Sequence, residues 1–173
     1  MQLPMHRATA AAAAAAFSLA LAAPGPPPEP PRHPVPATPV RALPSLDSSD
    51  AAVREAIMKI PGASAFAPML ATDGIVRRFV MRVDDLASGS HDASPQALAA
   101  LADVDAKSAA MLYSRMYPLL QQAYEEHSPG RGYFNDRLVE AIDRLLAQRR
   151  DFAAPAHAKL AEMRRLLAMK GPR

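Results

Sequence analysis

The chain lacks cysteine and tryptophan altogether, and these absences limit what it can be. Without cysteine it can form no disulfide, no thiolate metal site and no thiol nucleophile, and it has no cysteine for lipid attachment. Only 5% of the 173 residues are aromatic while 50% are hydrophobic, so a core must be built mainly from Leu, Ile, Val, Met and Ala. Because alanine, leucine and methionine favour helices, this composition indicates a helical fold.

Recognisable catalytic motifs are also missing from the sequence. The five histidines have no zinc-protease spacing, and no GxGxxG, P-loop or GxSxG motif is present. Adjacent acidic residues such as Asp84 and Asp85 would point about 100° apart on a helix, so they cannot share a proton as an acid/base dyad. We therefore predict no catalytic, cofactor or metal site, and a protein that is not an enzyme.

The first 22 residues have the three-part pattern of a secretory signal peptide. Arg7 supplies the early charge, an uncharged run of 16 residues follows from Ala8 to Ala23, and small residues stand at Ala20 and Ala22. This pattern predicts cleavage after Ala22. An uncleaved membrane anchor is the alternative, although the run is shorter than the roughly 20 residues that cross a bilayer as a helix. Either outcome predicts a location in the periplasm or cell envelope, secreted or anchored at the inner membrane.

Residues 23–44 form a proline-rich linker. Ten of the 21 residues from Pro24 to Pro44 are proline, which excludes regular helix or sheet and favours a semi-rigid polyproline II spacer. Its expected role is to set a distance. A ligand for a proline-recognising module is the other interpretation.

Residues 45–173 are predicted to form a single all-α domain, a small helical bundle of about five to seven helices. No stretch is typical of a strand. Asp47 or Ser48 is expected to cap the first helix, and Thr72 or Asp73 the next. Later caps are expected at Ser94, before Pro95, and at Asp105, and a last, basic helix begins near Pro155 after a break at 149–151.

The longest amphipathic stretch runs from Met111 to Leu146. Its apolar positions recur at helical spacing on both sides of a turn at 127–132, which predicts an antiparallel helical hairpin. Pro118 lies inside the first helix and should bend it. In the second helix the apolar stripe covers close to half of the circumference, so we expect that helix to pack against more than one neighbour.

A candidate partner surface follows from polar and aromatic residues beside these apolar faces. Three tyrosines line one edge of the first helix of the pair, where they either cover the core or form one wall of a groove. Two arginines of the helix at 75–86 lie beside Asp84 and Asp85, and a third, at the margin of the apolar arc, is expected to be half-buried with its guanidinium paired. The full set is Tyr113, Tyr117, Tyr124, Arg77, Arg78, Arg82, Asp136 and Arg137.

Charge is unevenly distributed: residues 1–43 carry +2, residues 44–148 carry −4, and residues 149–173 carry +5. The reading we favour is a non-enzymatic envelope protein that contacts a protein partner, with nucleic acid not expected. One alternative is a membrane- or nucleic-acid-binding module that uses the basic C-terminal helix. The other is an enzyme whose site assembles only in the fold, from Arg77, Arg78, Tyr113, Tyr124, Asp136 and Arg137.

Three blocks of the sequence resemble a proteobacterial family of domains of unknown function, number 3014. They are LPSLDSSDAAVREAI at 43–57, DGIVRRFVMRVDDLA at 73–87 and LYSRMYPLLQQAYEEHSPGRGYFNDRLVEAIDRLL at 112–146. The resemblance implies a domain behind an N-terminal membrane segment and a proline-rich linker. It also implies a shortened member, because family members have longer segments where this chain has only 88–110 and 148–154. It implies no activity.

Overall fold

The computed structural model describes residues 29–35, 42–148 and 154–168. Six α-helices and two 3₁₀ helices make up this part of the chain, which contains no strand, so the all-α prediction is confirmed. The predicted signal peptide and the break at 149–151 lie outside the described residues. In order the elements are η1 (Leu46–Ser48), α1 (Asp50–Met58), η2 (Ala63–Met69), α2 (Ile75–Ser88), α3 (Pro95–Ala102), α4 (Ala106–His127), α5 (Phe134–Ala147) and α6 (Ala154–Leu167).

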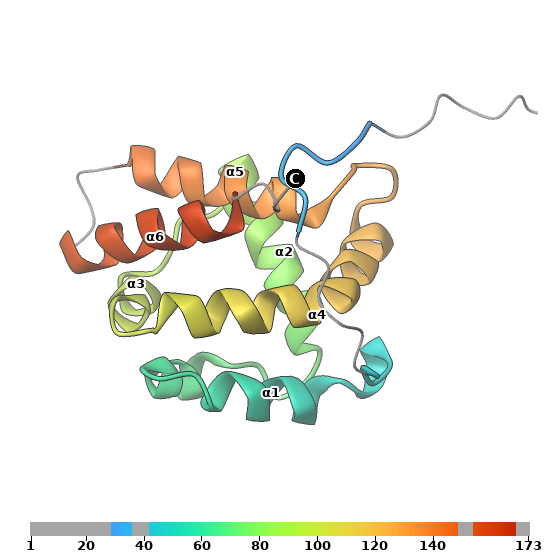
Figure 1. Cartoon of the computed structure of the whole chain (residues 1–173), viewed down its shortest axis with the longest axis horizontal. Coiled ribbons are helices and arrows are strands. Elements are labelled where there is room, and N and C mark those ends of the chain that lie inside the picture. The colour runs from blue at the N-terminus through green and yellow to red at the C-terminus, as the bar shows by residue number, and fades with distance from the viewer. Residues whose placement is uncertain (1–28, 36–41, 149–153, 169–173) are drawn as a thin grey trace, which may run out of the picture.

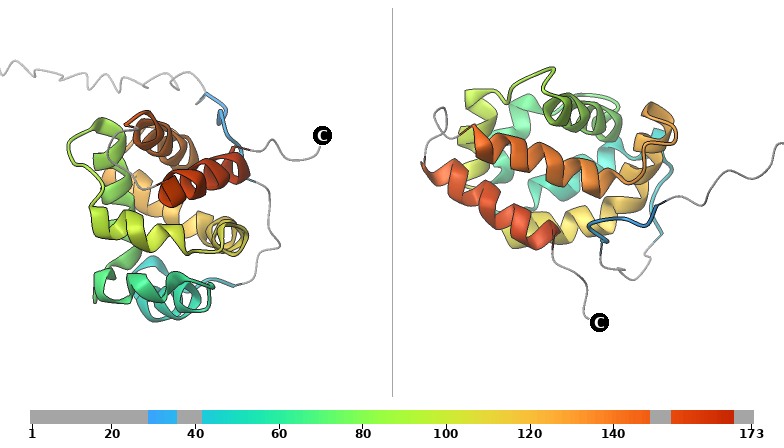
Figure 2. Two further views of the ribbon diagram at one scale, coloured as in Figure 1. Left: turned by 90° about the vertical axis from the view of Figure 1, so that its left-hand side faces the viewer. Right: turned by 90° about the horizontal axis from the view of Figure 1, so that it is seen from above.

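Helix α2 lies at the centre of the bundle. In Figure 1 it passes behind α4, between α1 on one side and α5 on the other, while α5 and α6 lie side by side. Figure 2 shows the same pairing of α5 and α6 from above. The side chains of α2 that face inward are buried: Ile75, Val76, Val80, Val83 and Ala87.

The expected antiparallel hairpin of α4 and α5 is not the main packing unit, so this prediction is wrong. The two helices contact each other only slightly, and each packs instead against α2. The predicted bend is present, because Figures 1 and 2 show the second half of α4 turned away from the first. Pro118 lies inside this helix. Because α4 is bent, it contacts α5 over a short length only. The wide apolar stripe of α5 packs instead against α2 and α6, which agrees with the expectation that this helix has more than one neighbour.

Two helix starts are confirmed at the atomic level. The Ser94 side chain accepts a hydrogen bond from the Ala97 N–H, and the Asp105 side chain accepts one from the Ser108 N–H. Both are local N-caps, in which a side chain satisfies a backbone donor three residues ahead.

The other two predicted caps are wrong. At α2, a residue distant in sequence caps the helix in place of the local one. Helix α2 begins at Ile75 rather than after Thr72 or Asp73, and the carboxylate of Asp50 in α1 accepts the N–H groups of Gly74 at 2.7 Å and Ile75 at 2.8 Å. Helix α1 itself begins at Asp50, after a 3₁₀ turn that contains the residues expected to cap it.

Gly62 ends the turn after α1 and brings it against the chain beyond α3. Its φ is 80°, and a Cβ there would overlap the Asp103 carbonyl oxygen. The preceding residue, Pro61, accepts a hydrogen bond from the Asp105 N–H at 2.9 Å. Glycine is therefore required both for the left-handed backbone and for the close approach.

Candidate functional site

The three tyrosines of α4 gather around Phe134, the first residue of α5. The ring of Tyr124 lies 5.7 Å from that of Phe134 and is 2% exposed, while the ring of Tyr113 lies 6.5 Å away. Tyr113 in turn contacts Tyr117 at 5.9 Å between ring centroids. Of the two roles considered for these tyrosines, the contacts show the covering of the core.

Burial changes the acid–base behaviour of this cluster. It raises the pKa of Tyr117 to about 12, and it also raises the pKa of Tyr113, with Tyr117 and Asp136 contributing in the same direction. Both hydroxyls therefore remain protonated at neutral pH, and both donate hydrogen bonds: Tyr113 to Asn135 Oδ1 at 2.9 Å and Tyr117 to Gln121 Oε1 at 3.0 Å.

Asn135 connects three parts of the chain beneath these tyrosines. It is fully buried, and its Oδ1 accepts the Tyr113 hydroxyl. Its Nδ2 donates to the carbonyl of His33 at 2.6 Å and to the carbonyl of Leu167, the last residue of α6, at 3.2 Å. A helix leaves its final carbonyls without intrahelical partners, so Asn135 caps α6 while it holds the segment around His33.

Asp136 holds the same segment from the other side. Its Oδ2 accepts the N–H of Arg32 at 3.0 Å, and its Oδ1 accepts the N–H of His33 at 2.7 Å. Figure 1 shows residues 29–35 passing beside the beginning of α5. Part of the predicted linker is thus bound to the helical domain. We call Asn135 and Asp136, with the backbone positions they contact, the peptide site.

A cleft of about 420 Å³ continues from the peptide site along the loop before α5. Its walls include Arg131 and Tyr133 of that loop, Glu140 of α5 and Glu29 of the bound segment. Charges of both signs line it, so it suits a polar ligand better than an apolar one.

Arg137, the next residue of α5, belongs to a half-buried ionic cluster. Its Nε lies 2.6 Å from Asp84 Oδ1, and its guanidinium also bonds Glu140 at 2.8 Å. Burial acts to lower the pKa of Arg137, but the hydrogen bonds to Glu140 and Asp84 raise it above its ordinary value. His127 Nε2 lies 3.5 Å from the other oxygen of Asp84. The cluster joins α2, α4 and α5.

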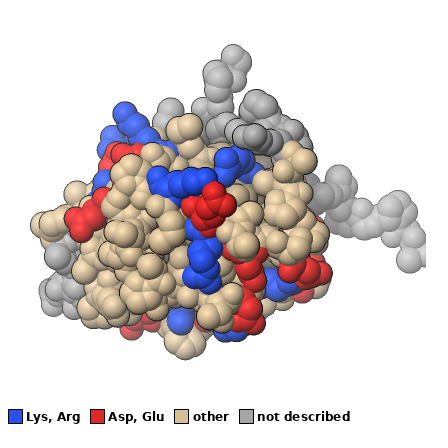
Figure 3. All heavy atoms as spheres, turned by 90° about the horizontal axis from the view of Figure 1, so that it is seen from below, with Lys and Arg blue, Asp and Glu red and all other residues tan. Residues whose placement is uncertain are grey.

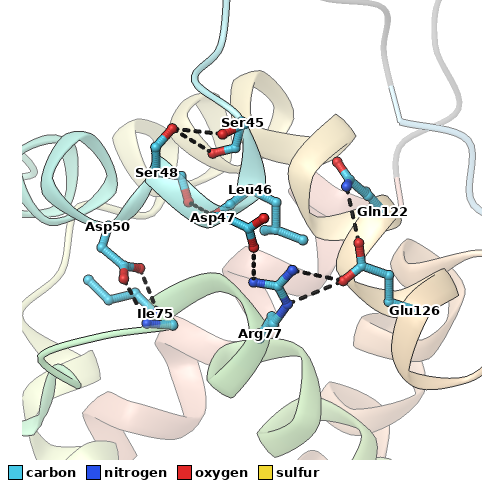
Figure 4. Close-up of polar contacts among 11 residues, drawn as sticks. Ser45, Leu46, Asp47, Ser48, Asp50, Ile75, Arg77, Gln122 and Glu126 are labelled. Atoms are coloured by element: carbon cyan, nitrogen blue, oxygen red, sulfur yellow. Dashed lines mark hydrogen bonds and ion pairs between the residues drawn. The ribbon is translucent and has the colours of Figure 1, made fainter.

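Arg77 and Arg78 of α2 do not pair with Asp84 and Asp85 of the same helix, so this expectation is wrong. Figure 4 shows Arg77 between η1 and α4, where it bonds Asp47 at 2.8 Å and Glu126 at 3.0 Å. Arg78 bonds Asp73, just before the helix, at 3.2 Å.

Arg82 is exposed, which corrects the expectation that it would be half-buried and paired. The sequence suggests a buried arc of α2 wide enough to reach Arg82, but the buried arc in the structure is narrower and is centred on Val76, Val80 and Val83. Phe79, three residues before Arg82 and on the same side, is itself 43% exposed. Arg82 therefore falls outside the packed face.

The basic character of α6 is partly balanced within the fold. Arg164 lies 2.6 Å from Asp143 of α5, and Lys159 lies 3.4 Å from Glu162. On the face of the molecule that carries α1, Figure 3 shows acidic and basic side chains interspersed over a largely uncharged surface. A second cleft, of about 700 Å³, lies between α1 and α4 and is lined mainly by aliphatic side chains, with three basic residues: Lys59, Lys107 and Arg115.

The candidate residues are thus divided among several places. Asp136 belongs to the peptide site, and Tyr113 reaches that site through its bond to Asn135. Tyr117 and Tyr124 pack beside Tyr113 and Phe134, and Arg137 lies in the ionic cluster. The three arginines of α2 lie elsewhere: Arg77, Arg78 and Arg82. Sequence reasoning missed Asn135. A signal was available, because Asn135 stands seven residues before Ile142 and so falls within the apolar stripe of α5.

The arrangement contacts main-chain groups, since it offers one carboxylate and one carboxamide to the backbone of Arg32 and His33. Among the residues that the structure describes, no three His, Asp or Glu side chains are placed to hold a metal ion. No helix of this part of the chain is long and apolar enough to cross a membrane.

The fold and the peptide site define an all-α domain that holds residues 29–35 of its own chain at the start of α5. A family model described as "Protein of unknown function (DUF3014)" matches residues 95–163, from the start of α3 into α6. The match agrees with the family resemblance of the sequence over this part of the chain, which contains the third of the three blocks. No curated protein and no solved structure matches the chain.

Proposed function

We propose that this protein is a non-enzymatic interaction module of the bacterial cell envelope, which binds a polypeptide segment at the peptide site. The observation that carries the proposal is the pair of hydrogen bonds from two consecutive backbone N–H groups to the Asp136 carboxylate. Hydrogen bonds to an ionised acceptor are stronger than neutral ones. Main-chain recognition of this kind is a recurring way to bind peptides.

The envelope location rests on the sequence of residues 1–22. If they are a signal peptide, mature protein isolated from a native-like host begins near Ala23. N-terminal sequencing of protein from fractionated cells checks this. An intact Met1 on membrane-bound protein would instead identify an anchor.

Two other functions remain as rivals with distinct behaviour. Binding of phosphate groups through α6 would weaken steeply with salt, whereas docking of a polypeptide backbone at the peptide site would change little. An enzymatic site would need polar groups that converge, but Arg77 and Arg78 are bonded to Asp47, Glu126 and Asp73, away from the peptide site.

Site-specific photo-crosslinking in intact cells tests the interaction. A photoreactive residue at Tyr133, in the wall of the cleft, should trap a discrete envelope protein. The same residue at Met81, which is 48% exposed on α2, should not.

The crosslink should be lost in Asp136→Asn, because the carboxamide is neutral and an NH2 group, which donates rather than accepts, replaces one of the two acceptor oxygens. Asp143→Asn, the same change at an exposed position of the same helix, is the matched control and should leave the crosslink unchanged. Equal crosslinking at Tyr133 and Met81, or a Tyr133 crosslink that survives Asp136→Asn, would contradict the proposal.

A further inference from the structure

The bound segment has an unusual supply of hydrogen-bond donors. Its sequence from Pro30 to Pro34 is Pro-Pro-Arg-His-Pro, and proline has no backbone N–H. Arg32 and His33 therefore carry the only two main-chain N–H groups of these five residues. Both donate to Asp136, one to each carboxylate oxygen. The donor pattern of the segment and the acceptor pattern of the site match completely.

The acceptor side of the segment is also used. The His33 carbonyl accepts the Asn135 Nδ2 at 2.6 Å, so this one residue is bonded through both its N–H and its C=O. Pro31, His33 and Val35 are half-buried while Arg32 and Pro34 are exposed. Alternate residues face the domain, and the chain bends at Arg32 and His33. The bend brings two consecutive N–H groups to the same carboxylate.

Proline also lowers the entropic cost of this docking. Each proline fixes its own φ and restricts the residue before it, so few backbone conformations are open to the segment before it binds. Little conformational freedom is then lost when it is ordered, and rigid ligands gain affinity for this reason. Only six residues, 36–41, separate the segment from Ala42, which keeps it near the site.

We infer that residues 29–35 are a tethered ligand of the peptide site, and that the same site takes in trans a segment of the form Pro-X-X-Pro that bends as residues 32 and 33 do, with X any residue that has a backbone N–H. The inference rests on the proposed function and names its partner class and its regulation. A partner segment binds only by displacing the tethered one. A short tether gives an effective concentration of about 1 mM. If a free segment binds with a Kd of about 0.1 mM, the tethered copy weakens its binding about tenfold.

The test removes one main-chain donor of the tethered ligand in the full-length mature chain. His33→Pro deletes the N–H that bonds Asp136, whereas His33→Ala keeps it and serves as the matched control. The probe is a synthetic peptide of residues 29–35, titrated into ¹⁵N-labelled protein while the Asn135 side-chain amide is followed by NMR. We expect the peptide to bind His33→Pro about tenfold more tightly than the unaltered chain or His33→Ala.

Two further controls keep the result interpretable if His33→Pro perturbs the fold. Adding Asp136→Asn to His33→Pro should abolish peptide binding. A peptide whose residue-33 amide is N-methylated should fail to bind any variant, and this control needs no change in the protein. Equal affinity of the peptide for the unaltered chain and His33→Pro would overturn the tethered-ligand inference, as would binding that is indifferent to N-methylation.

The outcomes separate the inference from the proposed function. If the peptide fails these tests but the Tyr133 crosslink persists and depends on Asp136, the site binds an envelope partner without a tethered competitor. If the peptide behaves as expected but no crosslink forms, the tethered ligand stands and the site serves to fix residues 29–35 to the domain.

Discussion

Replacement of Asn135 by alanine tests whether this buried carboxamide joins the N-terminal segment, α4 and α6. The side chain makes three hydrogen bonds, to the Tyr113 hydroxyl and to the carbonyls of His33 and Leu167. A typical hydrogen bond contributes about 1 kcal/mol net, and a buried group left without a partner costs about 1 to 3 kcal/mol. We expect Asn135→Ala to lower the free energy of unfolding by about 2 to 4 kcal/mol.

The measurement is urea unfolding followed by circular dichroism at 222 nm, which suits a helical chain that has no tryptophan to report by fluorescence. Gln148→Ala is the matched control, because it removes a carboxamide at the other end of α5 whose only described hydrogen bond is a 3.5 Å contact with Asp92. It should change the free energy of unfolding by less than about 0.5 kcal/mol.

A double-mutant cycle isolates the bond to Tyr113. Tyr113→Phe alone should cost about 1 kcal/mol, and the double variant with Asn135→Ala should cost about 1 kcal/mol less than the sum of the two changes, because both remove the same bond. A cost below about 1 kcal/mol for Asn135→Ala, or strict additivity in the cycle, would refute the bonding scheme.

Three further changes test other parts of the fold. Asp50→Ala should lower the free energy of unfolding by about 1 to 2 kcal/mol, because it leaves two N–H groups at the start of α2 without a cap; an unaltered urea midpoint would show that water replaces the carboxylate. Ile142→Ala should cost about 2 to 5 kcal/mol, since the side chain is 5% exposed in the core; a thermal midpoint within 1 °C of the unaltered protein would contradict this burial. The pKa of Tyr117 is raised from 10.0 to about 12, so the unfolded chain loses this phenolic proton at a lower pH than the folded protein, and the resulting contribution to stability is complete below about pH 10 and falls as the pH rises towards 12. Between pH 8 and pH 11 the thermal midpoint of Tyr117→Phe should therefore fall less than that of the unaltered protein. Equal falls would argue against the shift.

The local features of the fold were predictable because their causes are local. Ser94 and Asp105 each bond a backbone N–H three residues ahead, so the signal and its effect share one short stretch of sequence. Pro118 bends its own helix for the same reason. The wide stripe of α5 indicated two packing partners but not which helices they are.

The errors arose where a distant residue replaced a local one. Asp50 caps α2 across 24 and 25 residues, and Gln121 of α4 accepts the Phe134 N–H at the start of α5 across 13. The hairpin prediction assumed that helices next to each other in sequence pack together. Here α2 supplies a larger apolar face to both α4 and α5, and burial of apolar surface is the dominant favourable term in folding.

The sequence by itself determined that this protein is helical, roughly where each helix lies, and that a proline-rich stretch precedes the domain, because composition, periodicity and proline geometry act over a few residues. Only the tertiary structure decided the peptide site. Its bonds join Arg32 and His33 to Asp136 across 104 and 103 residues, and His33 to Asn135 across 102. From the sequence, a carboxylate in the first turn of a helix, such as Asp136, is equally well explained as one that stabilises the start of its own helix. It binds the backbone of residues 32 and 33 only because packing of the whole bundle brings that segment against it.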